Sequence, residues 1–211
     1  MMDWTFKSNE VVDEFDAHVR EQLPWYELVT ESIVYIARNY LPKEGLIYDI
    51  GASTGNMAKA LEELVEERNA VLYAVEESPE MCSIFKKNHP DKFLIEMDAT
   101  NLHYEKFDVA IVMLTAMFFP VARQTDFFNN LFNQLNEGGA IIVVDKSCDE
   151  DGYFATVMKR LTLYWKLKNG ATPENIIKKE LSLSGIQRPI KMFGGKQFFQ
   201  LGEFKGWVIE K

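Results

Sequence analysis

Hydrophobic and polar positions alternate in blocks along the chain from Gly45 onward. Short runs rich in β-branched and aromatic residues are separated by longer stretches with helical spacing of apolar residues, which is typical of a parallel sheet with crossover helices. The run at 140–145 is apolar on both faces, as expected for a strand at the centre of a covered sheet. Strands are predicted at 46–50, 71–76, 93–97, 108–113 and 140–145.

Helical periodicity fills the segments between these runs. Ser78 followed by Pro79 predicts a helix cap and the first helical residue, and this helix should end near Asn88. Further helices are predicted at 56–67, 124–135, 153–168 and 173–183.

The two ends of the chain differ from this alternating pattern. Residues 197–210 predict a hairpin that turns between Gly202 and Gly206, so the last strand should be antiparallel. The beginning is helical, with Pro24 separating segments at 10–20 and 28–39.

We therefore expect two parts. Residues 1–44 form a helical N-terminal cap packed against the sheet, and residues 45–211 form a Rossmann-like three-layer α/β sandwich. Its sheet should be seven-stranded and mostly parallel with an antiparallel last strand.

Composition indicates a single soluble domain with one core. The chain has 211 residues, of which 47% are hydrophobic. The longest apolar stretch, at 108–121, is too short for a bilayer, and an acidic segment follows the start where a signal peptide would be apolar. Cys82 and Cys148 stand in no metal-ligand spacing. We expect a cytoplasmic protein with no membrane partner and no metal.

Charge favours a small acceptor over nucleic acid. The net charge is −9, whereas proteins that clamp polyphosphate backbones usually carry a basic excess. One basic cluster is interpreted as a solvated helix face; it comprises Lys159, Arg160, Lys166, Lys168, Lys178 and Lys179.

The sharpest chemical signal is a glycine-rich turn between the first strand and the next helix. It contains Asp49, Gly51, Ala52, Ser53 and Gly55. Small residues at such a turn let the backbone approach a ligand closely, and the helix N-terminus offers N–H donors. The strand–turn–helix context makes a nucleoside-type site the preferred reading over a merely tight turn.

Acidic residues follow the next two strands. Glu76 ends the second strand, where an acid can accept hydrogen bonds from ribose hydroxyls, and Glu77 is a possible substitute. Asp98 ends the third strand and precedes Ala99; a carboxylate and an N–H at this point could recognise adenine. All of these residues are expected at the carboxyl edge of the sheet, where open α/β sheets bind ligands.

This glycine turn, Glu76, Asp98 and the Gly138-Gly139 turn resemble the class I S-adenosylmethionine-dependent methyltransferases. The resemblance implies that S-adenosylmethionine is the cofactor and S-adenosylhomocysteine its product. It also implies that the region of Asp49 and Gly51 holds the methionine part, Glu76 the ribose, and Asp98 with Ala99 the adenine. Thr115, just past the fourth strand, stands where many relatives contact acceptor or cofactor.

A narrower similarity reaches the N-terminus. Asp3–Phe6, Pro24-Trp25-Tyr26, Ser78-Pro79-x-Met81 and Lys168-Asn169-Gly170 resemble carboxy-S-adenosylmethionine synthases, which act in tRNA wobble-uridine modification and make a carboxylated cofactor. This resemblance implies that Tyr26 contacts the cofactor from the cap and that the protein is a homodimer.

One residue that the synthases use is missing. The arginine that pairs with the new carboxylate is expected in the helix after Asn169-Gly170, but residues 176–180 contain none, and Lys178 and Lys179 are the available substitutes. Lysine lacks the bidentate fork of arginine.

The leading functional hypothesis is therefore a methyltransferase that acts on a small molecule or a nucleobase, tRNA included. Methyl transfer depends mainly on alignment, so the sequence names no catalytic residue. Three alternatives are synthesis of a modified cofactor, a non-catalytic, cofactor-binding partner subunit, and a nicotinamide-dependent dehydrogenase, which the serine in the glycine turn and the terminal hairpin disfavour. Four aromatic residues are candidates for a wall over the cofactor: Trp25, Tyr26, Tyr164 and Trp165.

Overall fold

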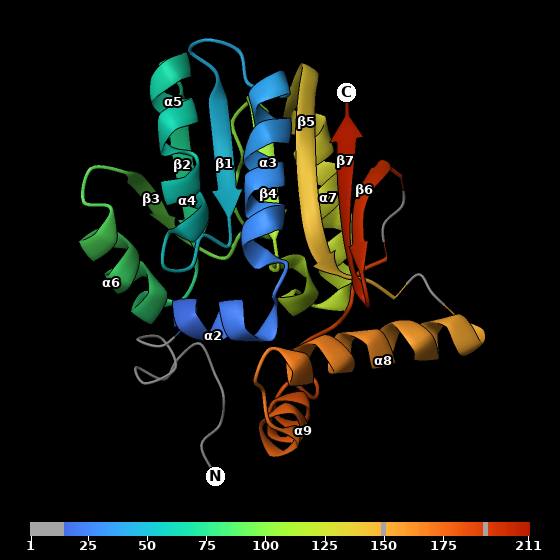
Figure 1. Ribbon diagram of the computed structural model, residues 1–211. Coiled ribbons are helices and arrows are strands. Elements are labelled where there is room, and N and C mark those ends of the chain that lie inside the picture. The colour runs from blue at the N-terminus through green and yellow to red at the C-terminus, as the bar shows by residue number, and fades with distance from the viewer. Residues whose placement is uncertain (1–14, 149–150, 192–193) are drawn as a thin grey trace.

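A computed structural model describes residues 15–148, 151–191 and 194–211 (Figure 1). The motif Asp3–Phe6 and the first residues of the helix predicted from residue 10 lie outside this range. The rest of the predicted elements can be compared directly with the structure.

A single sheet of seven strands forms the middle layer, in the order β3-β2-β1-β4-β5-β7-β6. β1 to β5 run parallel, and β7 is antiparallel to both of its neighbours. The predicted seven-stranded, mostly parallel sheet with an antiparallel last strand is confirmed. The strands are β1 (Leu46–Ile50), β2 (Val71–Glu76), β3 (Phe93–Glu96), β4 (Phe107–Met113), β5 (Leu135–Lys146), β6 (Lys196–Leu201) and β7 (Phe204–Glu210).

Helices cover both faces of the sheet, because successive side chains of each strand point to opposite sides (Figure 1). Ile47 packs in one core cluster with α3 (Tyr26–Tyr40), α4 (Asn56–Ala60) and α5 (Glu62–Arg68). Its neighbour Tyr48 packs in the other cluster, with α7 (Val121–Gln134). The result is the predicted three-layer sandwich.

Several element boundaries differ from prediction, and three of the differences have a clear structural reason. The helix expected at 56–67 is divided at Leu61, which is fully buried between α4 and α5. α7 begins right after Pro120 and ends at Gln134. Leu135 already pairs with Phe107 as the start of β5, and the N–H of Gly138 donates to the carbonyl of Lys211, so residues expected as a turn extend the strand.

The α6 helix (Pro79–Asn88) follows its predicted start and end. The side chain of Ser78 accepts from the N–H of Met81, and Pro79 is the first helical residue. This cap fixes the direction of the chain just after β2 ends, beside the glycine turn.

The carboxyl edge of the parallel strands is covered by four helical elements (Figure 1). They are α2 (Phe15–Gln22), the 3-10 helix η1 (Ala116–Phe118), α8 (Gly152–Lys168) and α9 (Pro173–Ser182). Within the cap, α3 packs on the sheet while α2 crosses this edge. Among the described residues, none of the helices is both long and apolar enough to cross a bilayer.

Candidate functional site

A cavity of about 600 Å³ lies at the carboxyl edge of the sheet, beneath α2. This volume falls within the roughly 300–1,000 Å³ typical of small-molecule sites. The structure brings nine of the predicted site residues to its lining: Tyr26, Asp49, Gly51, Ala52, Ser53, Glu76, Glu77, Ala99 and Thr115. Gly55 and Asp98 are not part of the lining.

Sequence reasoning missed most of the apolar lining. Leu114, Leu183 and Ile186 lie on the wall toward η1 and α9, and no local pattern distinguishes them from core residues. Met81 also lines the cavity, and the helix cap at Ser78 is the signal that places it there.

The glycine turn is shaped by packing and internal hydrogen bonds. Gly51 has φ of +77°, and a Cβ there would collide with the Thr115 side chain. The N–H groups of Gly51 and Ala52 both donate to the carbonyl of Val75, at 2.8 and 3.0 Å. The N–H of Ser53 donates to Oε2 of Glu76 at 2.8 Å. These N–H groups are already hydrogen-bonded within the protein. The turn therefore lets a ligand approach the backbone closely but offers these donors to no phosphate group.

Gly55 and Ser53 have separate local roles. Gly55 has φ of +96°, and His89 packs against the place where its Cβ would be. Ser53 has φ of +51°, a left-handed conformation that costs a non-glycine residue about 1–2 kcal/mol. A glycine at this position would avoid that cost.

Glu76 is held rigidly at the end of β2. Its carboxylate accepts backbone hydrogen bonds from Ser53 (2.8 Å), Glu77 (3.0 Å) and Ser78 (2.9 Å). A carboxylate has about four acceptor positions, so about one remains for a ligand hydroxyl. Burial raises the pKa of Glu76 in spite of these hydrogen bonds. Glu77 beside it is exposed.

Asp49 provides an unsatisfied acceptor at the end of β1. The residue is 3% exposed, and its Oδ2 atom is buried without a hydrogen-bond partner. Burial, followed by the nearby negative charge of Glu76, raises the pKa of Asp49 to about 7. Two carboxyl groups that face one cavity favour a ligand that brings positive charge and N–H donors.

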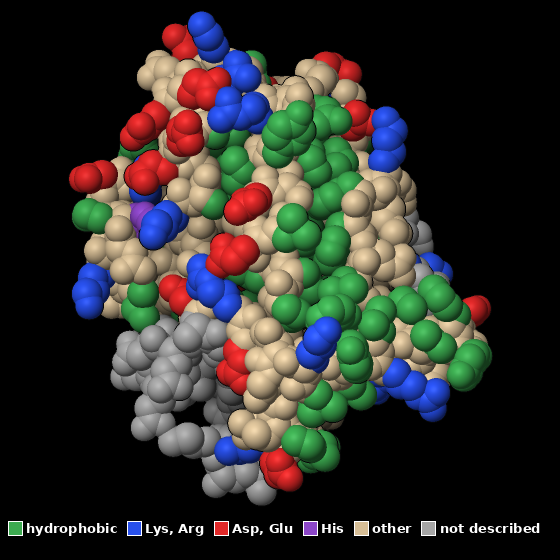
Figure 2. Space-filling model, in the orientation of Figure 1, with side chains coloured by type: hydrophobic (Ala, Val, Ile, Leu, Met, Phe, Trp, Pro, Cys, Tyr) green, Lys and Arg blue, Asp and Glu red, His purple; other side chains and the backbone are tan. Residues whose placement is uncertain are grey.

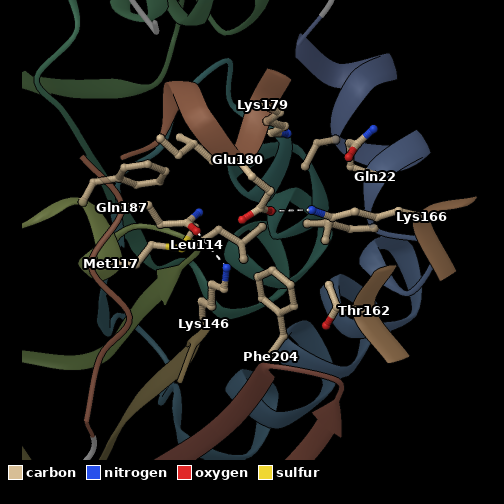
Figure 3. Close-up of a pocket in the computed structure, with 14 residues that line it drawn as sticks. Gln22, Leu114, Met117, Lys146, Thr162, Lys166, Lys179, Glu180, Gln187 and Phe204 are labelled. Carbon is tan, nitrogen blue, oxygen red and sulfur yellow. Dashed lines mark hydrogen bonds and ion pairs between the residues drawn. The ribbon is translucent and has the colours of Figure 1, made fainter. Parts of the chain in front are cut away.

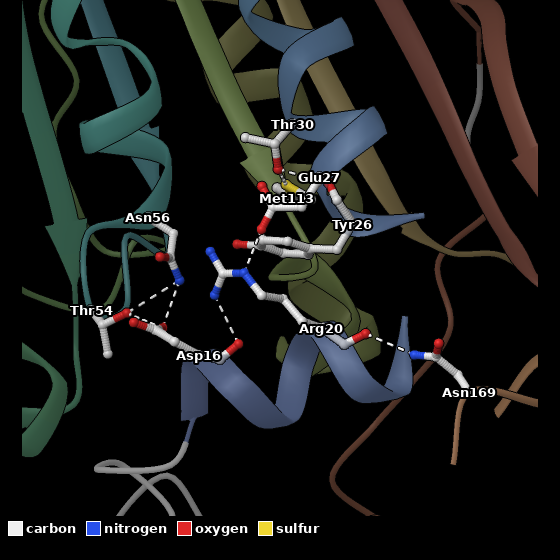
Figure 4. A network of polar contacts seen from close by, with 9 residues as sticks. All are labelled: Asp16, Arg20, Tyr26, Glu27, Thr30, Thr54, Asn56, Met113 and Asn169. Atoms are coloured by element: carbon white, nitrogen blue, oxygen red, sulfur yellow. Dashed lines mark hydrogen bonds and ion pairs between the residues drawn. The ribbon is translucent and has the colours of Figure 1, made fainter. Parts of the chain in front are cut away.

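Tyr26 reaches this cavity from the cap (Figure 4). The Arg20 guanidinium lies over its ring, 5.6 Å from the centroid, and is also paired with Glu27. Burial raises the pKa of the Tyr26 hydroxyl to about 12, with Asp49 as the next cause. Tyr26 is therefore a neutral wall residue with a hydroxyl donor.

Asp16 ties the cap to the glycine turn (Figure 4). Its Oδ1 accepts from Thr54 Oγ1 at 2.7 Å and from Asn56 Nδ2 at 2.6 Å. At the other end of α2, Asn169 Nδ2 donates to the carbonyls of Arg20 (3.1 Å) and Glu21 (2.6 Å). These contacts hold α2 across the mouth of the cavity.

Asp98 stabilises the turn after β3. Its carboxylate accepts from the N–H of Thr100 (2.8 Å), from Asn101 Nδ2 (3.0 Å) and from Arg123 (3.0 Å). The following residue, Ala99, lines the cavity. Thr115 also lines it, while its hydroxyl donates to backbone carbonyls of Ile50 and Met113.

The expected aromatic wall consists of Tyr26 alone. Trp25 packs instead against Phe199 and Phe204, with ring centroids 5.1 and 5.2 Å apart. Tyr164 and Trp165 contact each other on α8 and do not line the cavity.

The interpretation of the basic cluster as a solvated face is wrong for two of its lysines (Figure 3). Lys166 is 7% exposed and pairs with Glu180 at 3.1 Å, and both Lys166 and the half-buried Lys179 line a second, smaller cavity between α8 and α9. Packing of α9 against α8 covers them, which a charge pattern on a single helix does not reveal. Lys178 is exposed, as expected.

No group of three or more His, Cys, Asp and Glu side chains with metal-site geometry occurs among the residues that the structure describes.

Comparison with known proteins identifies this architecture. Residues 48–143 match the family model described as a methyltransferase domain. The carboxy-S-adenosyl-L-methionine synthase of Staphylococcus epidermidis is 30% identical over 205 residues, covering 96% of this chain and 89% of that protein. The synthase of Shewanella piezotolerans is 26% identical, covering 96% and 91%.

A solved structure shows the same fold over the full length. A Methanococcus maripaludis protein, assigned to the S-adenosyl-L-methionine-dependent methyltransferases, aligns with a TM-score of 0.61 at 18% identity, covering 100% of this chain and 96% of that one. The chain therefore belongs to the class I S-adenosylmethionine-dependent methyltransferase superfamily, and within it to the family that includes the carboxy-S-adenosyl-L-methionine synthases.

Proposed function

We propose that the chain is an enzyme that binds S-adenosylmethionine in the cavity at the carboxyl edge and transfers its methyl group to a small-molecule acceptor. The observation that carries this proposal is the pair of carboxyl groups beside the glycine turn. Glu76 is oriented by three backbone N–H groups, and Asp49 keeps an unpartnered oxygen. Both suit a cationic ligand that carries an ammonium group and ribose hydroxyls.

The residue roles follow from this placement. Asp49 and the turn at Gly51 hold the methionine part, Glu76 accepts from the ribose, and Tyr26 closes the site from the cap. Ala99 faces the adenine, and Asp98 holds the turn that presents it. When bound, the sulfonium supplies an already activated methyl group, so the protein has to align the acceptor and exclude water.

The backbone N–H groups of the glycine turn are already hydrogen-bonded within the protein, and this supports S-adenosylmethionine over a dinucleotide as the cofactor. Dinucleotide sites direct backbone N–H groups of the glycine turn at a pyrophosphate. Here the N–H groups of Gly51 and Ala52 donate to the carbonyl of Val75, and the N–H of Ser53 donates to the carboxylate of Glu76. S-adenosylmethionine has no phosphate and does not need them.

The acidic balance and the covering helices favour a small acceptor over a nucleobase in tRNA. The net charge is −9. Val19 of α2 borders the cavity, as do Leu183 and Ile186, which follow α9. A polyanionic acceptor would have to approach against this charge.

Cofactor carboxylation is the second candidate, and two observations favour it. The synthases of two bacteria are similar over 96% of this chain. Lys179 also places an amine beside the cofactor cavity, in the helix where the synthases are expected to carry an arginine. A lysine can pair with a carboxylate on the transferred carbon, but without bidentate geometry.

Product analysis tests both candidates. The purified protein is incubated with S-adenosylmethionine and a small-metabolite extract, and the nucleoside products are identified by mass spectrometry. S-adenosylhomocysteine together with a methylated metabolite supports methyl transfer, and a carboxylated S-adenosylmethionine supports the second candidate. A Glu76→Gln control should form less of either product at a limiting S-adenosylmethionine concentration. Tight cofactor binding without any product would contradict both and leave a non-catalytic subunit.

A further inference from the structure

The turn after β3 forms the part of the cavity that the proposed function assigns to the base of the cofactor. Ala99 lines the cavity and is 7% exposed, whereas the preceding residue, Asp98, does not belong to the lining. The carbonyl of Ala99 accepts from the hydroxyl of the buried Tyr104 at 2.9 Å. The backbone of the turn is therefore held in place, and it presents Ala99 to a ligand.

The Asp98 carboxylate is fully hydrogen-bonded within the protein. Its Oδ1 atom accepts from the N–H and from the hydroxyl of Thr100, at 2.8 and 2.7 Å. Its Oδ2 atom accepts from Asn101 Nδ2 and from the Arg123 guanidinium, both at 3.0 Å. A carboxylate has about four acceptor positions, so these four donors leave none for a donor on a ligand.

Arg123 fixes this arrangement from a distant part of the chain. It lies in the first turn of α7, and its Nη1 atom donates to Asp98 Oδ2 at 3.0 Å and to Thr100 Oγ1 at 2.7 Å. Turning the carboxylate toward the cavity would break the pair with Arg123 and both hydrogen bonds to Thr100. One hydrogen bond from a ligand amino group would not replace these three contacts.

The other residues that line this end of the cavity offer mainly apolar contacts. Met97 lines the cavity just before Asp98, and Phe119, which also lines it, packs on the same core cluster as Ala99. Glu77 lines the cavity too, but it is exposed, and an exposed carboxylate exchanges a ligand donor for water with little gain. A purine ring placed here would be held by apolar surface and by the backbone at Ala99.

We propose that the base subsite recognises the purine ring by its shape and by the backbone at Ala99, and does not recognise the amino group at position 6 of the ring. Asp98 is a positioning residue, which holds the turn and makes no contact with the base. This differs from the sequence-based expectation that the Asp98 carboxylate recognises adenine. The inference rests on the proposed function, because it concerns the base of the cofactor assigned to this cavity.

Calorimetric titration of two ligands into the full chain tests the proposal. The ligands are S-adenosylhomocysteine and its 6-deamino analogue, in which hydrogen replaces the amino group and the ring nitrogen N1 stays an acceptor. The wild-type chain should bind both with affinities that agree within about threefold. A charge-assisted hydrogen bond from the amino group to a carboxylate would instead make the analogue bind about tenfold or more weakly.

Asp98→Asn distinguishes positioning from direct contact. Because one oxygen becomes an NH₂ group that cannot accept, two of the four hydrogen bonds are lost and the turn loosens. Both ligands should therefore bind about three- to tenfold more weakly, with the ratio of their affinities unchanged. Asp126→Asn, at an exposed aspartate on α7, is the matched control and should leave both affinities as they are.

Two results would overturn the inference and leave the proposed function standing. One is a wild-type preference for S-adenosylhomocysteine over the analogue that exceeds threefold. The other is an Asp98→Asn protein in which the two ligands are not weakened equally, or are not weakened at all. Failure of the wild-type chain to bind S-adenosylhomocysteine would instead refute the proposed function, and with it this inference.

Discussion

At the scale of single residues, Asp49 links the stability of the empty protein to the binding of the cofactor. Its carboxyl group is buried beside Glu76 and has an oxygen without a partner. A group of this kind costs free energy in the empty protein and is available for a ligand donor. Cofactor binding and the stability of the empty protein should therefore respond in opposite directions when Asp49 is changed.

Asp49→Asn should stabilise the empty protein at pH 8 and weaken S-adenosylmethionine binding. Because burial raises the folded pKa of Asp49 from 3.8 to about 7, the folded state binds more protons than the unfolded state between these values. Wild-type stability therefore falls as the pH rises through this window, and the loss is complete above about pH 7.

The gain in the free energy of unfolding should be about 1–3 kcal/mol at pH 8 and should shrink toward pH 5. Denaturant unfolding at both pH values measures it, and calorimetry measures the cofactor affinity. Asp91→Asn, at an exposed aspartate, is the control for loss of charge alone. An Asp49→Asn protein with unchanged stability and unchanged affinity would contradict this role.

Sequence reasoning found site residues where the local pattern carries the signal. The glycine turn and Glu76 stand at strand ends, and the structure brings them to one cavity. It did not find that Gly51 also makes room for Thr115, or that Lys166 and Lys179 are covered. Those features depend on contacts between segments far apart in the chain.

At the scale of elements, α2 acts as a strap over the cofactor cavity. Asp16 joins it to the glycine turn, and Asn169 joins it to the end of α8. Site geometry should therefore depend on side chains that do not line the cavity themselves.

Asp16→Ala should weaken S-adenosylmethionine binding about three- to tenfold and lower the free energy of unfolding by about 1–2 kcal/mol. The reason is that the hydroxyl of Thr54 and the amide of Asn56 lose a shared charged acceptor. Calorimetry and denaturant unfolding measure the two effects. Glu31→Ala, at an exposed position on α3, should change neither. Equal effects of the two variants would show that Asp16 does not hold α2 over the cavity.

Element boundaries show the same limit of sequence reasoning. The cap at Ser78 and Pro79 fixes α6 locally, and its prediction is confirmed. The helix predicted at 56–67 is divided, and residues 135–139 continue β5, because tertiary partners at Leu61 and at the C-terminus decide the outcome. The division of the chain at residue 44 and a homodimeric state stay predictions.

At the scale of the whole molecule, the fold places two cavities side by side at one edge of the sheet. The larger is lined by the acidic residues Asp49 and Glu76, and the smaller by lysines together with Glu180. Leu114 and Phe118 line both cavities and separate them.

Calorimetric titration of S-adenosylmethionine into the wild-type chain and into Glu76→Gln tests the central claim most directly, with Glu77→Gln as the matched control. We predict wild-type binding with a dissociation constant of about 1 μM to 1 mM, the usual range for enzyme substrates. Glu76→Gln should weaken it by about 1–3 kcal/mol, and Glu77→Gln should leave it nearly unchanged. No binding to the wild type, or equal binding to wild type and Glu76→Gln, would contradict the assignment of this cavity to the cofactor.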